Sequence, residues 1–280
     1  MRRGVGTGSL STLAPGRPGP VVPKVPGAHA RSRAADPTGP RRRPCRTGPL
    51  VAGSRRGRAG RVSPSVAKPD QSVASLRMED VGRHWEELHA TKADDEVSWF
   101  RAEPASSLRL LEAWAPTHAG LVDVGAGSSP LVDRLLDAGW HDLTVLDVAA
   151  TALAKVRERL SGDAGAVTYT CADVRSWRPG RTFAAWHDRA VFHFLVDPVE
   201  RSRYVEAAAD ATVPAGVVVL ATFAADGPTQ CSGLPTSRYD ADELATCFDA
   251  AFDLVHAERE EHLTPFGSVQ PFTWVVLRRR

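Results

Sequence analysis

The residues best suited to chemistry start at a turn with two glycines, in the segment LVDVGAGSSPLVDRLL (121–136). Gly125 and Gly127 stand between an apolar run and a helical pattern, and without side chains they let the backbone bend sharply and a flat ligand lie against it. Asp147 ends the next apolar run, LTVLDV, about 20 residues later, where a carboxylate can accept hydrogen bonds from both hydroxyls of a ribose. This spacing favours a ligand that contains a nucleoside, although a tight turn and a helix cap are the ordinary alternatives.

The same turn lacks two features that a dinucleotide needs. The dinucleotide fingerprint has a third glycine, which GAGSSP does not supply, and it holds the pyrophosphate on amides of a helix N-terminus. Pro130 is expected to open the next helix, with Ser129 as its N-cap, and proline has no amide hydrogen to offer. The ligand is therefore expected to carry no phosphate. S-adenosylmethionine, which joins adenosine to an amino acid, meets that condition.

The elements around this turn follow the rhythm of strand–helix–strand units. Two helical stretches, within 84–100 and 104–115, come first and are joined by a polar acidic loop around Asp94, Asp95 and Glu96. Short apolar strands then alternate with helical patterns as far as GVVVLATF (216–223). The last two apolar runs, 252–263 and 270–280, indicate a terminal hairpin. This order predicts a largely parallel sheet, in which ligands bind beyond the carboxyl ends of the strands.

These motifs together resemble the class I S-adenosylmethionine-dependent methyltransferases over roughly residues 80 to 280. The family's first motif is similar to LVDVGAGSS, its ribose-binding acid to the one in TVLDVA, and its adenine-binding segment to TCADVRSW. The resemblance implies an α/β, Rossmann-like, seven-stranded mixed sheet of strand order 3-2-1-4-5-7-6 with helices on both faces. It also implies S-adenosylmethionine as cofactor, bound by Asp123, Gly125, Ala126, Gly127, Asp147, Val148, Asp173 and Val174.

The fourth strand of that fold ends in FAAWHDRAVFHFLVDP (183–198), which the resemblance implies faces the methyl group. His187 is the candidate general base, and Asp188 the candidate that orients it or holds a cationic substrate. Ordinary structural roles compete, because Asp188 and Arg189 can pair with each other, and Trp99 and His193 can be core residues. The residues expected to contact the methyl acceptor are Trp99, Arg189, His193, Arg238 and Tyr239, the last two in the long insertion 223–240.

The acceptor itself stays open between an oxygen or nitrogen atom of a small molecule and a protein lysine. HWEELHATKADDEVSWF resembles the N-terminal segment of protein-lysine methyltransferases, in which an acidic, aromatic entrance suits a cation, and small-molecule methyltransferases of the trans-aconitate type share the layout. A nicotinamide-dependent oxidoreductase and a non-catalytic adenosine-binding module are the competing functions. No metal is expected, because His187 and His193 lack partners at a known ligand spacing.

The first quarter of the chain differs in composition from the rest. Residues 1–70 hold 13 arginines, 2 lysines and 2 aspartates, a formal charge of +13, together with 11 prolines and 11 glycines, which leaves −11 for the remainder. We expect 1–77 to be disordered and 78–280 to be the folded domain. The basic segment can be a nucleic-acid-binding arm, a transit peptide, or sequence upstream of a true start at Met78, and the last is slightly favoured.

The charge, the hydrophobic pattern and the cysteines of the chain restrict its possible partners and its compartment. The acidic charge after residue 70 argues against a nucleic-acid acceptor, and the absence of any apolar run of about 18 residues argues against a membrane partner. The four cysteines have no CxxC spacing, which indicates a reducing compartment. We therefore expect a cytoplasmic monomer.

Overall fold

The computed structural model describes residues 78–116, 118–161 and 165–280. The predicted disordered segment 1–77 lies outside the described residues. The helices are α1 (Met78–Thr91), α2 (Ala105–Trp114), α3 (Leu131–Asp137), α4 (Ala150–Arg159), α5 (Pro198–Ala211) and α6 (Ala241–Thr246), with single 3-10 turns η1 (Asp94–Glu96) and η2 (Phe192–Phe194). The strands are β1 (Leu121–Val124), β2 (Leu143–Asp147), β3 (Val167–Cys171), β4 (Phe183–Arg189), β5 (Thr212–Phe223), β6 (Gln230–Cys231), β7 (Leu234–Pro235), β8 (Phe252–Leu263) and β9 (Val269–Arg279).

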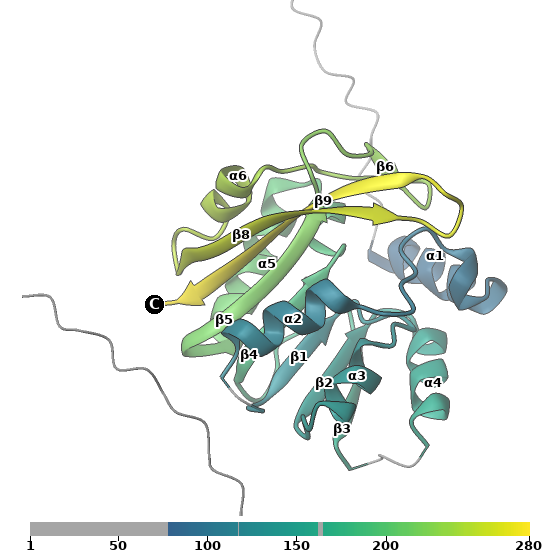
Figure 1. Ribbon diagram of the computed structural model, residues 1–280, viewed down its shortest axis with the longest axis horizontal. Helices are drawn as coiled ribbons and strands as arrows, with labels where there is room; N and C mark the ends of the chain where they lie inside the picture. The colour runs from purple at the N-terminus through teal and green to yellow at the C-terminus, as the bar shows by residue number, and fades with distance from the viewer. Residues whose placement is uncertain (1–77, 117, 162–164) are drawn as a thin grey trace, which may run out of the picture. The chain divides into compact units, whose positions relative to one another are not determined.

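Seven of these strands form one sheet in the order β3-β2-β1-β4-β5-β9-β8 (Figure 1). The first five are parallel, and β9 runs antiparallel to both of its neighbours, β5 and β8. β6 and β7 form a separate small hairpin inside the insertion. Since β8 and β9 are the sixth and seventh strands of the main sheet in chain order, the predicted order 3-2-1-4-5-7-6 is confirmed.

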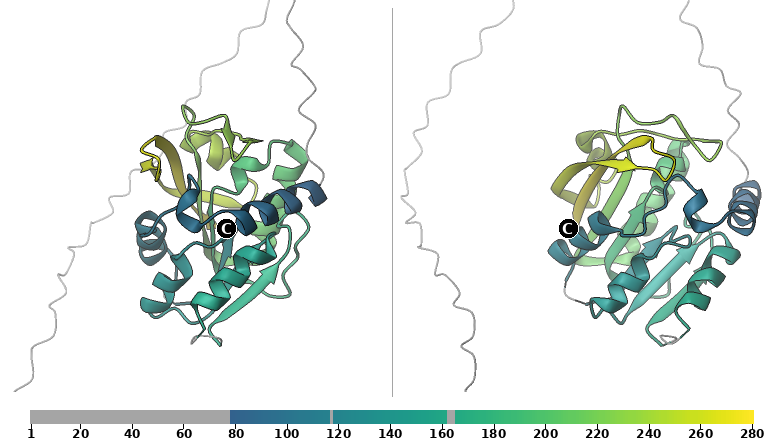
Figure 2. Two further views of the ribbon diagram at one scale, coloured as in Figure 1. Left: turned by 90° about the vertical axis from the view of Figure 1, so that its right-hand side faces the viewer. Right: turned by 45° about the vertical axis from the view of Figure 1, so that its right-hand side comes forward.

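Helices cover both faces of the sheet, as predicted (Figure 2). On one face α2, α3 and α4 contribute the buried side chains of Leu110, Leu135 and Val156 to a core. On the other face α5 and α6 contribute Tyr204 and Leu244 to a second core. A parallel strand covered on both sides has no solvent face, which is why β1 is buried at every position and is apolar apart from Asp123.

Before the sheet, the polar loop predicted around Asp94, Asp95 and Glu96 is confirmed, whereas the helix ahead of it begins earlier than the predicted position 84. α1 begins at Met78 and ends at Thr91, and η1 follows it in a loop. The acids in that loop have partners that favour a turn over a helix. Glu96 accepts a hydrogen bond from the amide of Ala93 at 2.9 Å, and Asp94 accepts one from the Ser128 hydroxyl at 2.7 Å.

α1 packs against α4 at one end of the molecule (Figure 1). The carboxylate of Glu86 on α1 accepts hydrogen bonds from the hydroxyl of Thr151 and, at 3.2 Å, from its amide in the first turn of α4. These hydrogen bonds lower the pKa of Glu86. The contact satisfies a helix N-terminal amide that α4 leaves without an intrahelical partner, and it places α1 beside the carboxyl ends of β1 and β2.

Among the described residues, no helix combines the length and apolar character needed to cross a bilayer.

Candidate active site

A cavity opens at the carboxyl ends of the parallel strands, where the sequence predicted the chemistry to lie. It is lined by all eight of the predicted cofactor-binding residues, Asp123, Gly125, Ala126, Gly127, Asp147, Val148, Asp173 and Val174. Four of the residues predicted to face the methyl group or the acceptor also line it, namely Trp99, His187, Arg189 and His193. Asp188, Arg238 and Tyr239 are not among the lining residues.

The glycine turn takes its shape from contacts within the chain. Gly125 and Gly127 adopt φ values of +62° and +54°, in the left-handed region that favours glycine. A Cβ atom on Gly125 would lie 2.0 Å from Cγ2 of Val191, and one on Gly127 would lie 3.5 Å from Cε1 of His89. The sequence reasoning expected a ligand to lie against both glycines, whereas the side chain of Val191 already occupies the space over Gly125.

Asp147 fastens this turn to the end of β2. Its two carboxylate oxygens accept hydrogen bonds from the amide of Gly127 at 2.7 Å and from the amide of Ala149 at 2.8 Å. Burial raises the pKa of Asp147, and burial also lowers the pKa of the neighbouring His89. Each carboxylate oxygen has a further lone pair for a ligand hydroxyl, so Asp147 can hold the turn and a ribose together.

The start of α3 lies one residue later than predicted. The helix begins at Leu131, after Pro130, and the Ser129 hydroxyl oxygen accepts a hydrogen bond from the amide of Leu131 at 3.2 Å. Ser129 therefore caps the helix from one position further out than the sequence indicated.

Asp173 has a partner that the sequence reasoning did not foresee. The guanidinium of Arg175 binds its carboxylate through Nε, 3.0 Å from Oδ2, and through Nη2, 2.6 Å from the same oxygen. Nη1 of Arg175 donates to Glu200 at 2.6 Å. A ligand amine at Asp173 would thus share a carboxylate that already carries an ion pair.

Alternation along β4 separates its polar residues onto two faces. Successive side chains of a strand point to opposite sides of the sheet, so His187 and Arg189 face the cavity while Asp188 faces α5. The neighbours agree with this, because Ala185 belongs to the core on the cavity side and Trp186 to the core with Tyr204. Of the three consecutive residues, His187 and Arg189 therefore lie at the cavity, whereas Asp188 lies on the opposite face of the sheet.

His187 is oriented by Asp123 across the β1–β4 ladder. The two residues are register partners in adjacent parallel strands, and His187 Nδ1 lies 2.7 Å from Asp123 Oδ1. Because a carboxylate only accepts, Nδ1 carries the hydrogen and Nε2 presents a lone pair. Nε2 is buried and has no hydrogen-bond partner among the described residues. The arrangement leaves a free, pre-oriented proton acceptor on the cavity side of β4.

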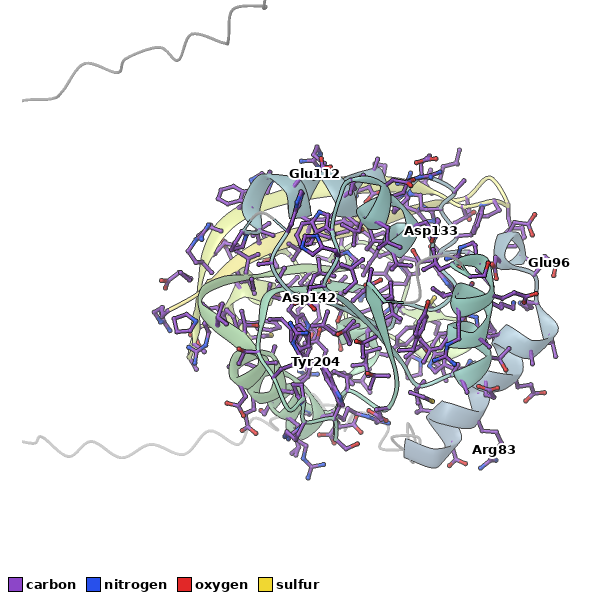
Figure 3. All side chains as sticks on the ribbon, turned by 90° about the horizontal axis from the view of Figure 1, so that it is seen from below. Arg83, Glu96, Glu112, Asp133, Asp142 and Tyr204 are labelled. Carbon is purple, nitrogen blue, oxygen red and sulfur yellow. The ribbon has the colours of Figure 1, made fainter. Side chains whose placement is uncertain are left out.

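Asp188 is buried on the opposite face with a partner for each oxygen. Oδ1 accepts from the amide of Val191 at 2.8 Å, and Oδ2 accepts from the amide of Phe192 at 3.0 Å and from the Tyr204 hydroxyl. Burial raises its pKa to about 6. Figure 3 shows Tyr204 well inside the rim of the molecule, at which Arg83 and Glu96 lie. This geometry corrects the predicted catalytic role, because Asp188 shapes the turn after β4 and does not face the acceptor.

Arg189 and His193 each bring a buried nitrogen without a partner to the cavity. Arg189 donates through Nη1 to the carbonyl of Trp99 at 3.0 Å, while no described residue accepts from Nη2. His193 Nδ1 accepts from the amide of Phe223 at 3.3 Å, so the ring hydrogen lies on Nε2, which also has no described partner. Burial lowers the pKa of Arg189 to about 10 and the pKa of His193 to about 3. The Asp188–Arg189 pair, which was the structural alternative to a role at the site, does not form, since the two residues have other partners.

Two predicted acceptor residues lie outside the cavity. Arg238 donates through Nη1 to the carbonyl of Gly227 at 3.4 Å, and the Tyr239 ring packs against Phe192, with 5.8 Å between ring centroids. The tip of the insertion reaches the cavity through Cys231 instead. The insertion thus contributes a different residue from those that its polar composition suggested.

Sequence reasoning missed several lining residues that come from distant parts of the chain. Arg101, before α2, forms an ion pair with Glu260 on β8, and the indole Nε1 of Trp274 on β9 donates to the same carboxylate at 2.7 Å. His89 of α1 and Gln270 of β9 also line the cavity. Nothing in the local sequence of these residues indicates their partners, since the antiparallel insertion of β9 brings them together.

A comparison with protein families gives one match over the centre of this fold. Residues 121–216, from β1 to the start of the apolar part of β5, match the model of a family described as a methyltransferase domain. This central part of the chain is similar to methyltransferase domains. The predicted resemblance to this class of enzymes is therefore confirmed. No curated protein matches the chain in sequence.

Solved structures share the fold of this methyltransferase domain at low sequence identity. An S-adenosylmethionine-dependent methyltransferase from Anabaena variabilis is 15% identical with a TM-score of 0.57, over 71% of this chain and 93% of that one. The N-methyltransferase NodS from Bradyrhizobium japonicum, in complex with S-adenosylhomocysteine, is 14% identical with a TM-score of 0.54, over 70% and 98%. A protein solved in work on converting a disulfide bond into a thioacetal group during echinomycin biosynthesis is 15% identical with a TM-score of 0.58, over 71% and 92%.

Within the described residues of the methyltransferase domain, no group of three or more histidine, cysteine, aspartate or glutamate side chains is arranged to hold a metal ion.

Proposed function

We propose that the methyltransferase domain binds S-adenosylmethionine and transfers its methyl group to an oxygen or nitrogen atom of an acceptor, with His187 as general base. The observation that carries the proposal is the His187–Asp123 pair, which leaves His187 Nε2 unpartnered at the cavity. The family match and the fold support the choice of reaction class.

The residues at the glycine turn fit this cofactor. Asp147 offers free lone pairs for the two ribose hydroxyls, and the positive φ of Gly127 turns the backbone at the mouth of the cavity. Val148 and Val174 supply apolar surface for the adenine, and Asp173 is placed to accept from its amine. Pro130 has no amide for a phosphate, which agrees with a cofactor that carries none. When bound, S-adenosylmethionine supplies a methyl group on a positively charged sulfur.

His187 provides the base that an acceptor hydroxyl or ammonium group needs. An ammonium acceptor would first lose a proton to expose its lone pair. The acceptor's lone pair would then form the bond to the methyl carbon as the carbon–sulfur bond breaks and leaves its electrons on sulfur. The acceptor's proton moves to His187 Nε2, and the resulting imidazolium is stabilised by the Asp123 carboxylate at Nδ1. Solvent then takes the proton from Nε2 before the next turnover.

Aromatic side chains give the cavity an apolar wall that limits water. The Trp85 ring lies 5.7 Å from the ring of Trp99 and 5.1 Å from that of Phe194, measured between centroids and with the rings edge to face. All three residues line the cavity. Excluding water strengthens the electrostatic interactions inside a site and favours alignment of the acceptor with the methyl group. This gives Trp99 a role at the site beyond core packing.

The decisive experiment combines cofactor binding with methyl transfer. Calorimetry should show binding of S-adenosylhomocysteine and none of NADH, since the reverse would favour an oxidoreductase. Incubation of a fractionated cell extract with methyl-labelled cofactor should then label an acceptor. His187→Gln is expected to keep its affinity for S-adenosylhomocysteine and to lower the rate of transfer by roughly 10²- to 10⁴-fold.

The matched control is His141→Gln, because His141 is exposed and away from the cavity. This variant should retain full transfer. Unchanged transfer by His187→Gln would remove the base from the proposal. Absence of label in every fraction, with S-adenosylhomocysteine bound normally, would favour a non-catalytic adenosine-binding module.

A further inference from the structure

The acceptor end of the cavity holds a positive charge that no described residue neutralises. Arg189 forms no ion pair with any carboxylate among the described residues. Glu260 also lines the cavity, but its carboxylate already forms an ion pair with Arg101 and accepts a hydrogen bond from the indole of Trp274. Arg189 is half-buried, but its Nη2 atom is fully buried, and a charged donor removed from water without a partner is costly, so this arrangement is incomplete without an anion.

Apart from Arg101, whose positive charge also acts on Arg189 and which is paired with Glu260, the groups around Arg189 are uncharged. Burial lowers the pKa of His193 to about 3 and that of His262 to about 4, and the charge of Arg189 adds to both effects, so both rings are neutral near pH 7. Burial raises the pKa of the Cys231 thiol, which keeps it protonated. The Arg189 guanidinium also lies 4.9 Å from the centre of the Phe272 ring. The surroundings therefore hold the guanidinium in place without cancelling its charge.

The free hydrogen-bonding atoms at this end match an acidic ligand. Arg189 Nη2 and His193 Nε2 are both donors without a described partner, and both residues line the cavity. An arginine fork suits a carboxylate, which accepts two hydrogen bonds in one plane. His187 and Arg189 are two residues apart on one face of β4, which separates their Cα atoms by roughly 7 Å. A carboxylate at Arg189 therefore places a nearby hydroxyl or amine of the same molecule within reach of His187.

The acidic loop that would favour a cationic acceptor is occupied by the chain itself. Asp94 accepts hydrogen bonds from the Ser128 hydroxyl at 2.7 Å and from Lys155 Nζ at 3.2 Å. Glu96 accepts from the amide of Ala93. With Asp94 and Glu96 engaged and no described carboxylate paired with Arg189, the charge at the Arg189 end of the cavity is the opposite of what a protein lysine requires.

We propose that the methyl acceptor is a small organic acid whose carboxylate binds Arg189 and His193 while its neighbouring hydroxyl or amine faces His187. This inference rests on the proposed methyltransferase function. The acceptor's nucleophilic atom takes the methyl group, the sulfur keeps the electrons of the broken carbon–sulfur bond, and the proton passes to His187 Nε2. The cofactor's own amino-acid portion also carries a carboxylate that suits Arg189. The experiment distinguishes this carboxylate from that of the methyl acceptor.

The test uses the full chain saturated with S-adenosylhomocysteine, with benzoate and neutral benzamide as matched probes. The ¹⁵Nε signal of Arg189, assigned by its loss in Arg189→Met, is followed by NMR during each titration. Benzoate should shift this signal to saturation and benzamide should not. In calorimetry, Arg189→Met should weaken benzoate binding by about 10-fold or more, and Arg189→Lys should weaken it less. The control Arg203→Met changes an exposed arginine on α5 and should leave benzoate affinity unaltered.

A second measurement shows whether the carboxylate that binds Arg189 belongs to the acceptor or to the cofactor. Wild-type protein and Arg189→Met are compared for binding S-adenosylhomocysteine and methylthioadenosine, which lacks the amino acid. Equal affinity of the two proteins for S-adenosylhomocysteine supports an acceptor carboxylate. A loss confined to S-adenosylhomocysteine assigns Arg189 to the cofactor and overturns the proposal, as does equal binding of benzoate and benzamide or no binding of either. Failure of wild-type protein to bind S-adenosylhomocysteine is a different result, which refutes the proposed function itself.

Discussion

On the face of β4 that packs against α5, Asp188 has hydrogen-bond donors at both carboxylate oxygens, whereas on the cavity face His187 and Arg189 each keep a buried nitrogen without a described partner. These three residues are consecutive in sequence, and all three have ionisable side chains. Buried polar groups are normally paired because an unpaired one costs free energy. The difference predicts that Asp188 contributes to stability, and it leaves the free nitrogens of His187 and Arg189 available to the ligands proposed above.

Asp147 combines a structural role with a position at the cavity. Its carboxylate is paired with two amides of the chain, as Asp188 is, yet it lines the cavity, as His187 does. A charged group with several lone pairs can therefore serve structure and ligand at once, whereas the single free nitrogen of His187 can serve only a ligand.

The largest effect should come from removing the paired carboxylate. Asp188→Ala leaves the Tyr204 hydroxyl and two buried amides without an acceptor, and we expect a loss of about 3 to 5 kcal/mol in the free energy of unfolding. Urea titration measures it, with Asp210→Ala on the surface of α5 as the control. A loss close to that of the control would mean that pairing on the α5 face carries little stability, and the contrast between the faces would fail.

Asp147→Ala should affect both binding and the glycine turn. Loss of the hydrogen bonds to the ribose hydroxyls should weaken S-adenosylhomocysteine binding by about 100-fold, as measured by calorimetry. The amides of Gly127 and Ala149 also lose their acceptor, so the unfolding midpoint should fall. Unchanged affinity in a folded variant would place the ribose elsewhere and would restrict Asp147 to the structural role.

The stability of the protein should depend on pH through His193. In the folded chain its pKa is lowered from 6.5 to about 3 by burial and by Arg189, so the unfolded chain binds more protons between these values. Stability from this group is complete above pH 6.5 and is lost as the pH falls towards 3, by at most about 1.4 kcal/mol per pH unit. Urea titrations from pH 7 to 5 should show a shallower loss for His193→Asn, in which the amide oxygen can replace Nδ1 as acceptor. Parallel curves for both proteins would contradict this.

The smallest expected effect is that of Tyr204→Phe. The hydroxyl donates to Asp188 and accepts from the indole of Trp186 at 2.9 Å, and its removal should cost about 1 kcal/mol of stability. Because that hydrogen bond lowers the pKa of Asp188, its loss should raise this pKa above about 6. Carboxyl ¹³C NMR titration of Asp188 measures the change. A pKa that does not rise would show that the two backbone amides alone hold the anion.

The fold could be predicted from local patterns because a few neighbouring residues were enough to indicate each strand or turn. The apolar runs of β1 and β2, the turn at Gly125 and Gly127, and the two terminal strands each have a period or a turn residue that predicts their structure. The acidic loop after the first helix was predicted correctly, whereas the start of that helix was wrong, since α1 begins at Met78 and not at residue 84. The partners of the loop acids in Ser128 and in the local backbone are not revealed by a pattern of apolar positions.

The site was only partly predictable for the same reason. Asp188 stood next to two cavity residues, and only the alternation of a known strand puts it on the other face. Arg238 and Tyr239 had the composition of a substrate loop, yet their backbone and ring contacts hold them outside the cavity. Arg101, Glu260 and Trp274 meet only in the folded chain.

The sequence by itself determined the sheet, the nucleoside-binding turn and the acid at the end of β2, because hydrophobic period, glycine and strand-end residues act over a few positions. The tertiary structure alone decided which polar atoms find partners. The register of β1 on β4 places Asp123 beside His187, and the insertion of β9 between β5 and β8 brings Trp274 to Glu260. Arg101 therefore has a carboxylate, whereas Arg189 has none within the described part of the chain. That difference depends on contacts between residues far apart in the chain, and it sets the charge of the acceptor end.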